Sequence, residues 1–271
     1  MAEVDFSWKS VVRRRFSAAQ SAERWSAMYG ERRMDIEDQF FRERRDFAVN
    51  YVLKHSPEDG VILDLGCGAA PFSTPMRAAG RTVVPLDYSP DMLALARQRL
   101  IAAKLPIYPL IQADSEALPF ADAQFDFTVC LGVISYLPDY STMLREIFRT
   151  LRRGSQAIIT TRNSRSPLVW DPLRTTRALL KGSLDRSENL SPGRLLDPVN
   201  VEADLVSAGF QIDAFTGMGF GPLRFRGHSV FGTDTSAKVS DGITRIAHGL
   251  GSKWMFRNCA DVNLWICRRP A

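Results

Sequence analysis

Residues 61–72 read VILDLGCGAAPF, and this stretch decides the fold of the 271-residue chain. Its first five residues form a short apolar run, which predicts a buried parallel strand. Gly66 and Gly68 follow directly. Glycines allow a sharp turn into a helix and a close approach of the backbone to a ligand. Because open α/β sheets bind ligands beyond the carboxyl ends of their strands, the stretch predicts a ligand site after the first strand.

The chain alternates strands with helices from this point onward. Apolar runs predict further strands at residues 82–87, 107–112, 125–131, 156–161, 210–216 and 262–267. Between them lie amphipathic segments with helix signals, such as the cap Ser89-Pro90-Asp91. The alternation predicts the α/β class, as a doubly wound, seven-stranded, mostly parallel sheet covered by helices on both faces.

Two parts of the chain depart from this alternation. Residues 1–58 lack strand signals and are expected to form an N-terminal helical cap on a main domain of residues 59–271. Within that domain, segments 162–198 and 217–260 are long interruptions, which we expect to be ordered lids. The second begins with Gly217-Met218-Gly219-Phe220-Gly221, which we interpret as a flexible turn because no helix signal follows it.

Composition narrows the class of protein. A hydrophobic content of 45%, a charged content of 24% and a net charge of +5 are ordinary for a globular chain and exclude wholesale disorder. Four cysteines without CxxC spacing, and no secretory leader, favour a reduced cytoplasmic protein without a metal site. Arginines cluster near the amino end. They indicate a solvated helix face, with peripheral membrane contact as the alternative.

Carboxylates close the second and third predicted strands. Asp87 lies 21 residues after Gly66, where an acid can accept both hydroxyls of a ribose. Asp114 follows the third strand, where a carboxylate can accept from an exocyclic adenine amine. The alternative is structural: Asp64 would then cap the following helix, and Asp87 would be a turn residue. The two acids favour a nucleoside site at this edge of the sheet.

Four stretches taken in order resemble one known family. They read VILDLGCGAAPF, VVPLDYSPDMLALA, QADSEALPFADAQFDFTVC and MLREIFRTLRRG, and cover about residues 61–160. The sequence resembles the class I S-adenosylmethionine-dependent methyltransferases, in the branch that acts on small molecules and lipids. The resemblance implies a Rossmann-like methyltransferase fold and S-adenosylmethionine as cofactor. It also implies transfer of a methyl group to a small, hydrophobic or aromatic metabolite by in-line displacement.

The resemblance implies a role for each matching position. The residues implied to lie near the methionine part of the cofactor are Asp64, Gly66, Cys67, Gly68, Leu131 and Gly132. Those implied to lie near the nucleoside are Asp87, Tyr88, Met92, Asp114 and Ser115. Tyr29 is the candidate for the methionine carboxylate, with Arg44 or Arg45 as partners. Core packing is the alternative for Tyr29, Tyr88, Met92 and Leu131, and a solvated helix face is favoured for the arginines.

The expected chemistry places few demands on the protein. Because the sulfonium is already an activated leaving group, the protein must supply an in-line approach at about 3 Å and a dry pocket. A base is needed only when the acceptor must lose a proton. His228 is the candidate base, and Tyr136 the candidate for shaping the acceptor pocket. Relatives often carry histidine near positions 135 and 136, where this chain has serine and tyrosine.

Three other functions remain in view. A cofactor-binding partner subunit without activity would carry the same acids. The fingerprint of a nicotinamide-dependent oxidoreductase requires a small residue five positions after Gly66, where this chain has Pro71. A nucleic-acid base methyltransferase typically carries an Asn-Pro-Pro-Tyr type of tetrapeptide, where this chain has Cys130-Leu131-Gly132-Val133. We therefore expect a small-molecule acceptor and no nucleic-acid partner, and the oligomeric state stays open.

Overall fold

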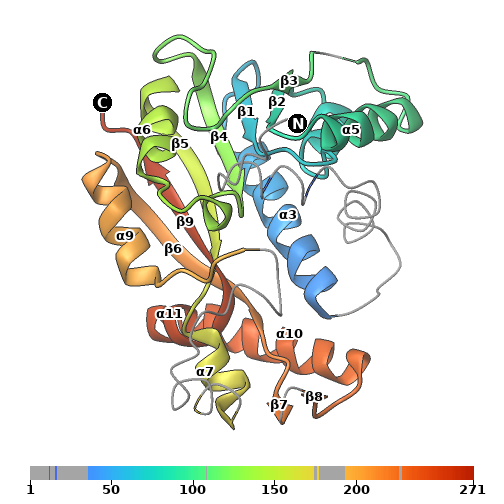
Figure 1. Ribbon diagram of the computed structural model, residues 1–271, viewed down its shortest axis with the longest axis vertical. Coiled ribbons are helices and arrows are strands. Elements are labelled where there is room, and N and C mark those ends of the chain that lie inside the picture. The colour runs from blue at the N-terminus through green and yellow to red at the C-terminus, as the bar shows by residue number, and fades with distance from the viewer. Residues whose placement is uncertain are drawn as a thin grey trace, which may run out of the picture.

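The computed structural model describes residues 36–107, 109–173, 193–225 and 228–271, together with Val12, Phe16 and Thr176. The described residues form one large sheet with helices on both faces (Figure 1). The candidate Tyr29 and, apart from Thr176, residues 174–192 of the first expected lid lie outside the described residues.

The sheet has seven strands in the order β3-β2-β1-β4-β5-β9-β6. Their bounds are β1 Val61–Leu65, β2 Thr82–Asp87, β3 Ile111–Gln112, β4 Phe125–Leu131, β5 Leu151–Arg162, β6 Gln211–Phe220 and β9 Ala260–Arg268. Strand β9 runs antiparallel to its neighbours β5 and β6, and the other pairings are parallel. The predicted seven-stranded, mostly parallel sheet is therefore confirmed.

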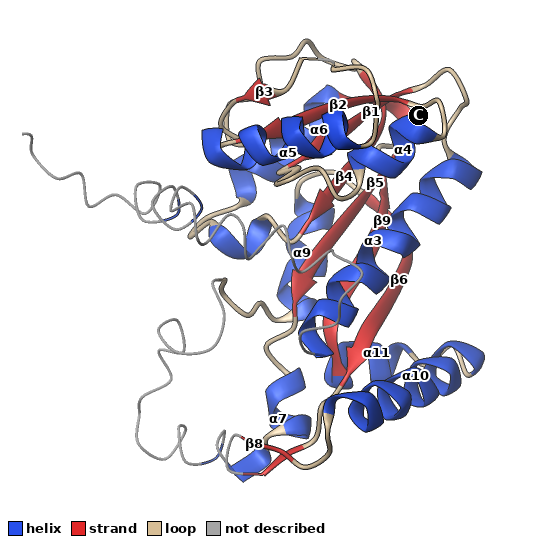
Figure 2. Ribbon diagram, turned by 90° about the vertical axis from the view of Figure 1, so that its right-hand side faces the viewer, coloured by secondary structure: helices blue, strands red, loops and turns tan. Residues whose placement is uncertain are grey.

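Among the described residues, helices cover both faces of the sheet. One face carries α3 (Ile36–His55) and α4 (Ser73–Ala78), and the other carries α6 (Ser141–Thr150) and α9 (Pro198–Ser207). Figure 2 shows α3 and α9 on opposite sides of the sheet. Both faces of the central strands are thus removed from water, which explains why their sequences are continuous apolar runs rather than alternating ones.

Other helices frame the two ends of the sheet. Helix α5 (Pro90–Ala102) packs on β2 and β3 and begins at the predicted cap, where Ser89 Oγ accepts the Met92 N–H. A short 3-10 helix, η1 (Ile134–Tyr136), follows β4. The remaining elements gather at the opposite end in both views. They are α7 (Ser166–Trp170), β7 (Arg224–Phe225), β8 (His228–Ser229), α10 (Thr233–Gly249) and α11 (Lys253–Cys259).

The interpretation of residues 217–221 as a flexible turn is wrong, because Gly217 to Phe220 continue strand β6. The glycines there permit close packing. A Cβ on Gly217 would lie 2.6 Å from the Cβ of Ala260, and one on Gly219 would lie 2.7 Å from the ring of Phe40. Helix α3 and the start of β9 therefore pack directly against the backbone of this edge strand.

The described residues of segment 217–260 form folded structure with a small core of their own. Phe220 from β6 packs there with Ala247 from α10 and with Phe256 and Cys259 from α11.

Within the described residues, no helix is long and apolar enough to span a bilayer. The same residues contain no grouping of three or more histidine, cysteine or acidic side chains placed to hold a metal ion.

Candidate functional site

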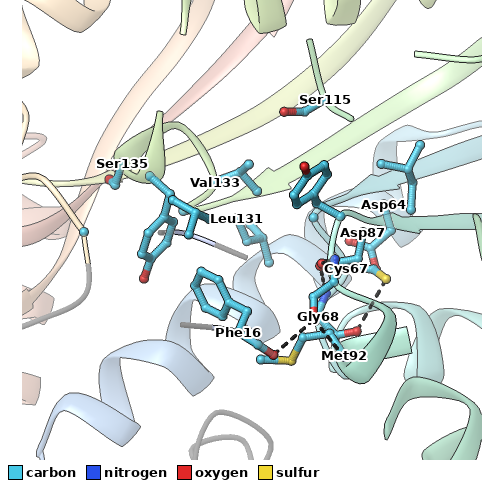
Figure 3. Close-up of a pocket in the computed structure, with 18 of the residues that line it drawn as sticks. Phe16, Asp64, Cys67, Gly68, Asp87, Met92, Ser115, Leu131, Val133 and Ser135 are labelled. Carbon is cyan, nitrogen blue, oxygen red and sulfur yellow. Dashed lines mark hydrogen bonds between the residues drawn. The ribbon is translucent and has the colours of Figure 1, made fainter. Parts of the chain in front are cut away.

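A pocket opens at the carboxyl ends of the central strands. Most of the candidate residues line it together: Asp64, Gly66, Cys67, Gly68, Asp87, Tyr88, Met92, Asp114, Ser115, Leu131, Gly132 and Tyr136. Figure 3 shows Asp64, Cys67, Gly68 and Asp87 on one side, and Leu131, Val133 and Ser135 on the other. The structure therefore brings residues that are distant in sequence into one concave site, where open α/β sheets bind ligands.

The bend after β1 forms the inner wall of this pocket. The N–H groups of Gly66 and Cys67 both donate to the carbonyl of Leu86, at 2.8 and 2.9 Å, which ties the bend to β2. Gly66 has φ +70°, and a Cβ there would lie 2.2 Å from Cγ2 of Val133. Only glycine fits this position, because an L side chain would suffer both backbone strain and a clash with the loop after β4.

Gly68, two residues further on, has φ +52°, and a Cβ there would meet no atom within 4 Å. It faces the open space of the pocket. The bend therefore offers exposed backbone beside an empty volume, a suitable cradle for a flexible ligand tail.

Asp64 lies near the end of β1 and is buried. Ser73 Oγ, from the first turn of α4, donates to its Oδ2 at 2.6 Å. Burial raises the pKa of Asp64 to about 7; the Ser73 hydrogen bond opposes the rise, and the charge of Asp87 adds to it. A carboxyl group in this state gains most from a ligand that brings a positive charge.

Asp87 ends β2 and joins the two loops that frame the pocket. Its Oδ2 accepts the N–H of Gly68 at 2.8 Å, and its Oδ1 accepts the N–H of Ser89 at 2.9 Å. Burial raises its pKa, and these backbone hydrogen bonds oppose the rise. Each carboxylate oxygen has a second lone pair, so each can also accept a hydrogen bond from a ligand.

Asp114 follows β3, the strand next to β2 in the sheet. Asp87 and Gln112 are paired across these two strands, so Asp87 and Asp114 lie at the same edge. Asp114 Oδ1 accepts the N–H of Glu116 at 2.9 Å, which shapes the turn after the strand. The two carboxylates therefore line neighbouring parts of one pocket wall.

The opposite wall is aromatic. The ring of Phe16 meets the ring of Tyr136 edge to face, with centroids 5.0 Å apart. The carbonyl of Phe16 accepts Ser89 Oγ at 3.0 Å, so Phe16 also contacts the start of α5. The sequence analysis missed Phe16, because the N-terminal segment carries no motif that says which apolar residue faces a pocket.

The solvated-face interpretation is wrong for Arg44. Its side chain is only 4% exposed and lines the pocket, with its guanidinium 4.7 Å from the ring centroid of Phe41. A Cβ on Gly132 would lie 2.7 Å from its Nη1. Arg44 is covered because α3 packs across β4 and β6. Arg45 points differently and pairs with Asp46 at 2.7 Å.

Arg162 is a second arginine of the pocket that the sequence analysis missed. It is the last residue of β5. The prediction ended that strand at residue 161, and extending it by one residue places Arg162 where the other site residues were found. Its side chain is 20% exposed and pairs with Asp261 at 3.3 Å.

The structure does not bring His228 to this pocket. His228 lies in β8, paired with Phe225 of β7, and its side chain is exposed. It is not among the residues that line the pocket. No step of the chemistry below is therefore assigned to it.

Comparison with known proteins agrees with this geometry. Residues 63–159 match the family model described as a methyltransferase domain. Demethylmenaquinone methyltransferase of Thermus thermophilus is 34% identical over 113 residues, which are 41% of this chain and 50% of that protein. Ubiquinone biosynthesis O-methyltransferase of Xylella fastidiosa is 25% identical over 191 residues, which are 69% of this chain and 75% of that protein.

The solved structure of magnesium protoporphyrin IX methyltransferase from Synechocystis PCC 6803, with bound S-adenosylmethionine, shares the fold. It superimposes with a TM-score of 0.62 at 17% identity, covering 99% of this chain and all of that one. The match to the family model runs from β1 into β5, and the chain spans half the length of the Thermus relative. The fold is therefore the Rossmann-like methyltransferase fold.

Proposed function

We propose that the chain is a class I methyltransferase, which binds S-adenosylmethionine and transfers the methyl group to a small, hydrophobic or aromatic metabolite. One observation carries the proposal. The carboxylate of Asp87 is held by the N–H groups of Gly68 and Ser89 at the pocket wall, beside Asp114 and above the open space at Gly68. Such a wall offers acceptors to a nucleoside and room to a flexible tail.

In this proposal each part of the pocket binds one part of the cofactor. Asp87 accepts the ribose hydroxyls, and Asp114 accepts the adenine amine with the Ser115 N–H beside it. Tyr88 and Met92 pack against the adenine. Leu131 and the bend at residues 66–68 hold the methionine part, with Asp64 toward its ammonium. Arg44 holds its carboxylate, because a guanidinium fork matches a carboxylate in geometry and charge.

The bound cofactor supplies an activated methyl group on a sulfonium, and the residues of the chain supply position and dryness. Phe16, Phe41 and Tyr136 line the pocket and offer an apolar wall to the acceptor. Transfer discharges the sulfonium, so a low-polarity site favours the transition state over the separated ions. Two of the relatives are named as demethylmenaquinone and ubiquinone biosynthesis methyltransferases, and a quinone-like ring fits against this wall.

The test is turnover with methyl-labelled S-adenosylmethionine against a panel of quinols, phenols and aromatic acids. We expect label in an extractable product and equimolar S-adenosylhomocysteine, and much less of both from the Asp87→Ala variant at a limiting cofactor concentration. Tight cofactor binding without transfer to any acceptor would favour the inactive partner subunit. No binding of the cofactor at all would contradict the proposal.

The four cysteines are buried free thiols, which supports a reducing, cytoplasmic setting.

Asp114→Asn should weaken binding of S-adenosylhomocysteine by about 5- to 30-fold, the cost of one lost hydrogen bond to a charged acceptor. The asparagine carbonyl still accepts the Glu116 N–H, so the turn stays formed. Its NH₂ group then faces the adenine amine, and two donors cannot bond. Calorimetry with the deaminated inosine analogue is the control. The preference for S-adenosylhomocysteine over its inosine analogue should be smaller in the variant than in the unaltered protein. An unchanged ratio of the two affinities would place the adenine elsewhere.

Affinity for S-adenosylhomocysteine should rise about tenfold between pH 6 and pH 8 and then level off. Asp64, with its pKa raised to about 7, is mostly protonated at the lower pH. Binding of the ligand ammonium must then expel a proton, whereas above pH 7 the carboxylate is already formed. Calorimetry in buffers of different ionisation enthalpy measures that proton release. Asp64→Asn keeps a hydrogen-bond partner for Ser73, and this variant should bind S-adenosylhomocysteine weakly, with an affinity that does not change with pH. If the affinity of the variant still rose between pH 6 and pH 8, Asp64 would not be the group that binds the ligand ammonium.

A further inference from the structure

Exposed apolar side chains gather at one end of the molecule. Among the described residues, ten of the fifteen exposed large hydrophobic side chains lie within residues 166–173 and 223–254. These stretches contain α7, β7, β8, α10 and the start of α11, which both views place together at the lower end of the sheet (Figures 1 and 2). Exposed apolar side chains that are concentrated in this way are typical of a docking surface.

Helix α10 carries the largest part of this surface. Its buried residues, such as Ala237, are small and face β6 and α3. Val239, Ile246 and Leu250 follow one another on the outer side at helical spacing. Ile246 is 59% exposed, Leu250 is 71% exposed, and Trp254 of α11 is 68% exposed. We refer to Val239, Ile246, Leu250 and Trp254 as the outer patch.

The exposed charges beside the outer patch are mainly positive. Lys238 and Arg245 are exposed on α10, and Lys253 is exposed at the start of α11. Asp234 is the one exposed acid among the described residues of these two helices, because Asp241 is half-buried and accepts a hydrogen bond from α3 at 2.7 Å. An apolar helix face flanked by lysine and arginine, with tryptophan beside it, is typical of a helix that lies on an anionic lipid surface.

We propose that this end of the molecule docks on an anionic membrane surface. The outer patch enters the head-group region, where its side chains leave water, and Lys238, Arg245 and Lys253 face the negative charge of the lipids. A second copy of the chain fits this surface less well. An antiparallel pairing of two α10 helices along the patch would set Lys238 and Arg245 of both copies along one edge, where like charges repel.

The position of this end suits the proposed function, although docking does not depend on that function. Strand β5 ends at Arg162, which lines the cofactor pocket, and α7 begins four residues later. Figure 1 shows α7 beyond the carboxyl end of β5. A bilayer against this end therefore lies on the side of the sheet where the pocket is formed, and a hydrophobic acceptor could be taken up from the lipid.

Co-sedimentation of the intact protein with vesicles tests the proposal. Vesicles of phosphatidylcholine mixed with phosphatidylglycerol are anionic, and vesicles of phosphatidylcholine alone are the neutral comparison. We expect stronger binding to the anionic vesicles, with a difference that shrinks as salt is added. Ile246→Ser combined with Leu250→Ser should weaken binding roughly tenfold or more, because both side chains leave water on docking. Arg245→Glu should weaken binding to the anionic vesicles about fivefold or more.

Matched variants on α5 separate docking from general effects. Ile101→Ser removes a comparably exposed apolar side chain, and Arg97→Glu makes the same change of net charge as Arg245→Glu. Helix α5 lies at the other end of the molecule (Figure 2). Both variants should therefore bind the anionic vesicles as the unaltered protein does. Thermal unfolding of every variant identifies a loss of binding that is caused by misfolding.

Three outcomes would overturn the proposal. The first is no binding to anionic vesicles, or binding that Ile246→Ser with Leu250→Ser leaves unchanged. The second is an equal loss in Arg245→Glu and Arg97→Glu, which would assign the binding to the overall charge of the protein. The third is a dimer in lipid-free buffer, measured by light scattering, that Ile246→Ser with Leu250→Ser dissociates, which would make the outer patch a subunit interface. All three are separate from failure of the proposed function, since vesicle binding needs no cofactor.

Discussion

Gly66→Ala is expected to abolish measurable binding of S-adenosylhomocysteine and to lower the free energy of unfolding by about 2–5 kcal/mol. Two costs add at this position. The backbone has φ +70°, which strains any residue with a Cβ, and the new Cβ would lie 2.2 Å from Cγ2 of Val133. Either the bend after β1 or the loop after β4 must move, and both line the pocket. Urea unfolding and calorimetry measure the two effects.

A matched control separates the clash from the strain. Gly80 has φ +78°, and a Cβ there would meet nothing within 4 Å, so Gly80→Ala should cost only about 1–2 kcal/mol and leave binding intact. Adding Val133→Ala to Gly66→Ala removes the clashing methyl group. The double variant should be more stable than the sum of the two single effects predicts, by about 1 kcal/mol or more. Strict additivity would show that Gly66 and Val133 do not meet.

Asp87→Ala should weaken binding of S-adenosylhomocysteine by about 30- to 150-fold, which corresponds to about 2–3 kcal/mol. The variant loses the acceptor for the ribose hydroxyls and also strands the N–H groups of Gly68 and Ser89. The first loss weakens the ligand contact directly, and the second loosens both loops around it. Calorimetry with S-adenosylhomocysteine measures the change.

The control for Asp87 is Asp91→Ala, which removes an acid from the first turn of α5 outside the pocket. Its effect on binding should stay within about twofold, because Asp91 does not line the pocket. Adenosine and methionine, tested separately on Asp87→Ala, locate the loss. We expect adenosine to lose affinity and methionine to keep it; the reverse pattern would move the ribose away from Asp87.

The central strands could be predicted from the sequence almost residue by residue. Strands β1, β2 and β4 begin and end where their apolar runs do, because both of their faces are buried. Strands β5 and β6 are longer than predicted. The extensions at Arg162 of β5 and at residues 217–220 of β6 pair with β9, and the β6 extension depends on packing of Gly217 and Gly219 against distant residues. The earlier start of β5, at Leu151, pairs with Phe125 of β4. Contacts of that kind leave no local periodicity to recognise.

Some residues of the site could likewise be predicted from the sequence, and others could not. Residues that follow a strand, such as Asp87 and Asp114, could be found because chain order alone places them at one edge of the sheet. Arg44 and Phe16 could not, since an N-terminal segment with mixed apolar and basic residues does not reveal which side chains face a pocket. The structure corrects the interpretation of Arg44, whereas Tyr29 stays a prediction outside the described residues.

A crystal structure of the protein grown with S-adenosylhomocysteine tests the central claim most directly. The account predicts adenosine between Asp87 and Asp114, both ribose hydroxyls on the Asp87 carboxylate, and the sulfur beside the bend at Gly66 and Gly68. An empty crevice at saturating ligand, or a nucleoside bound elsewhere on the protein, would contradict it.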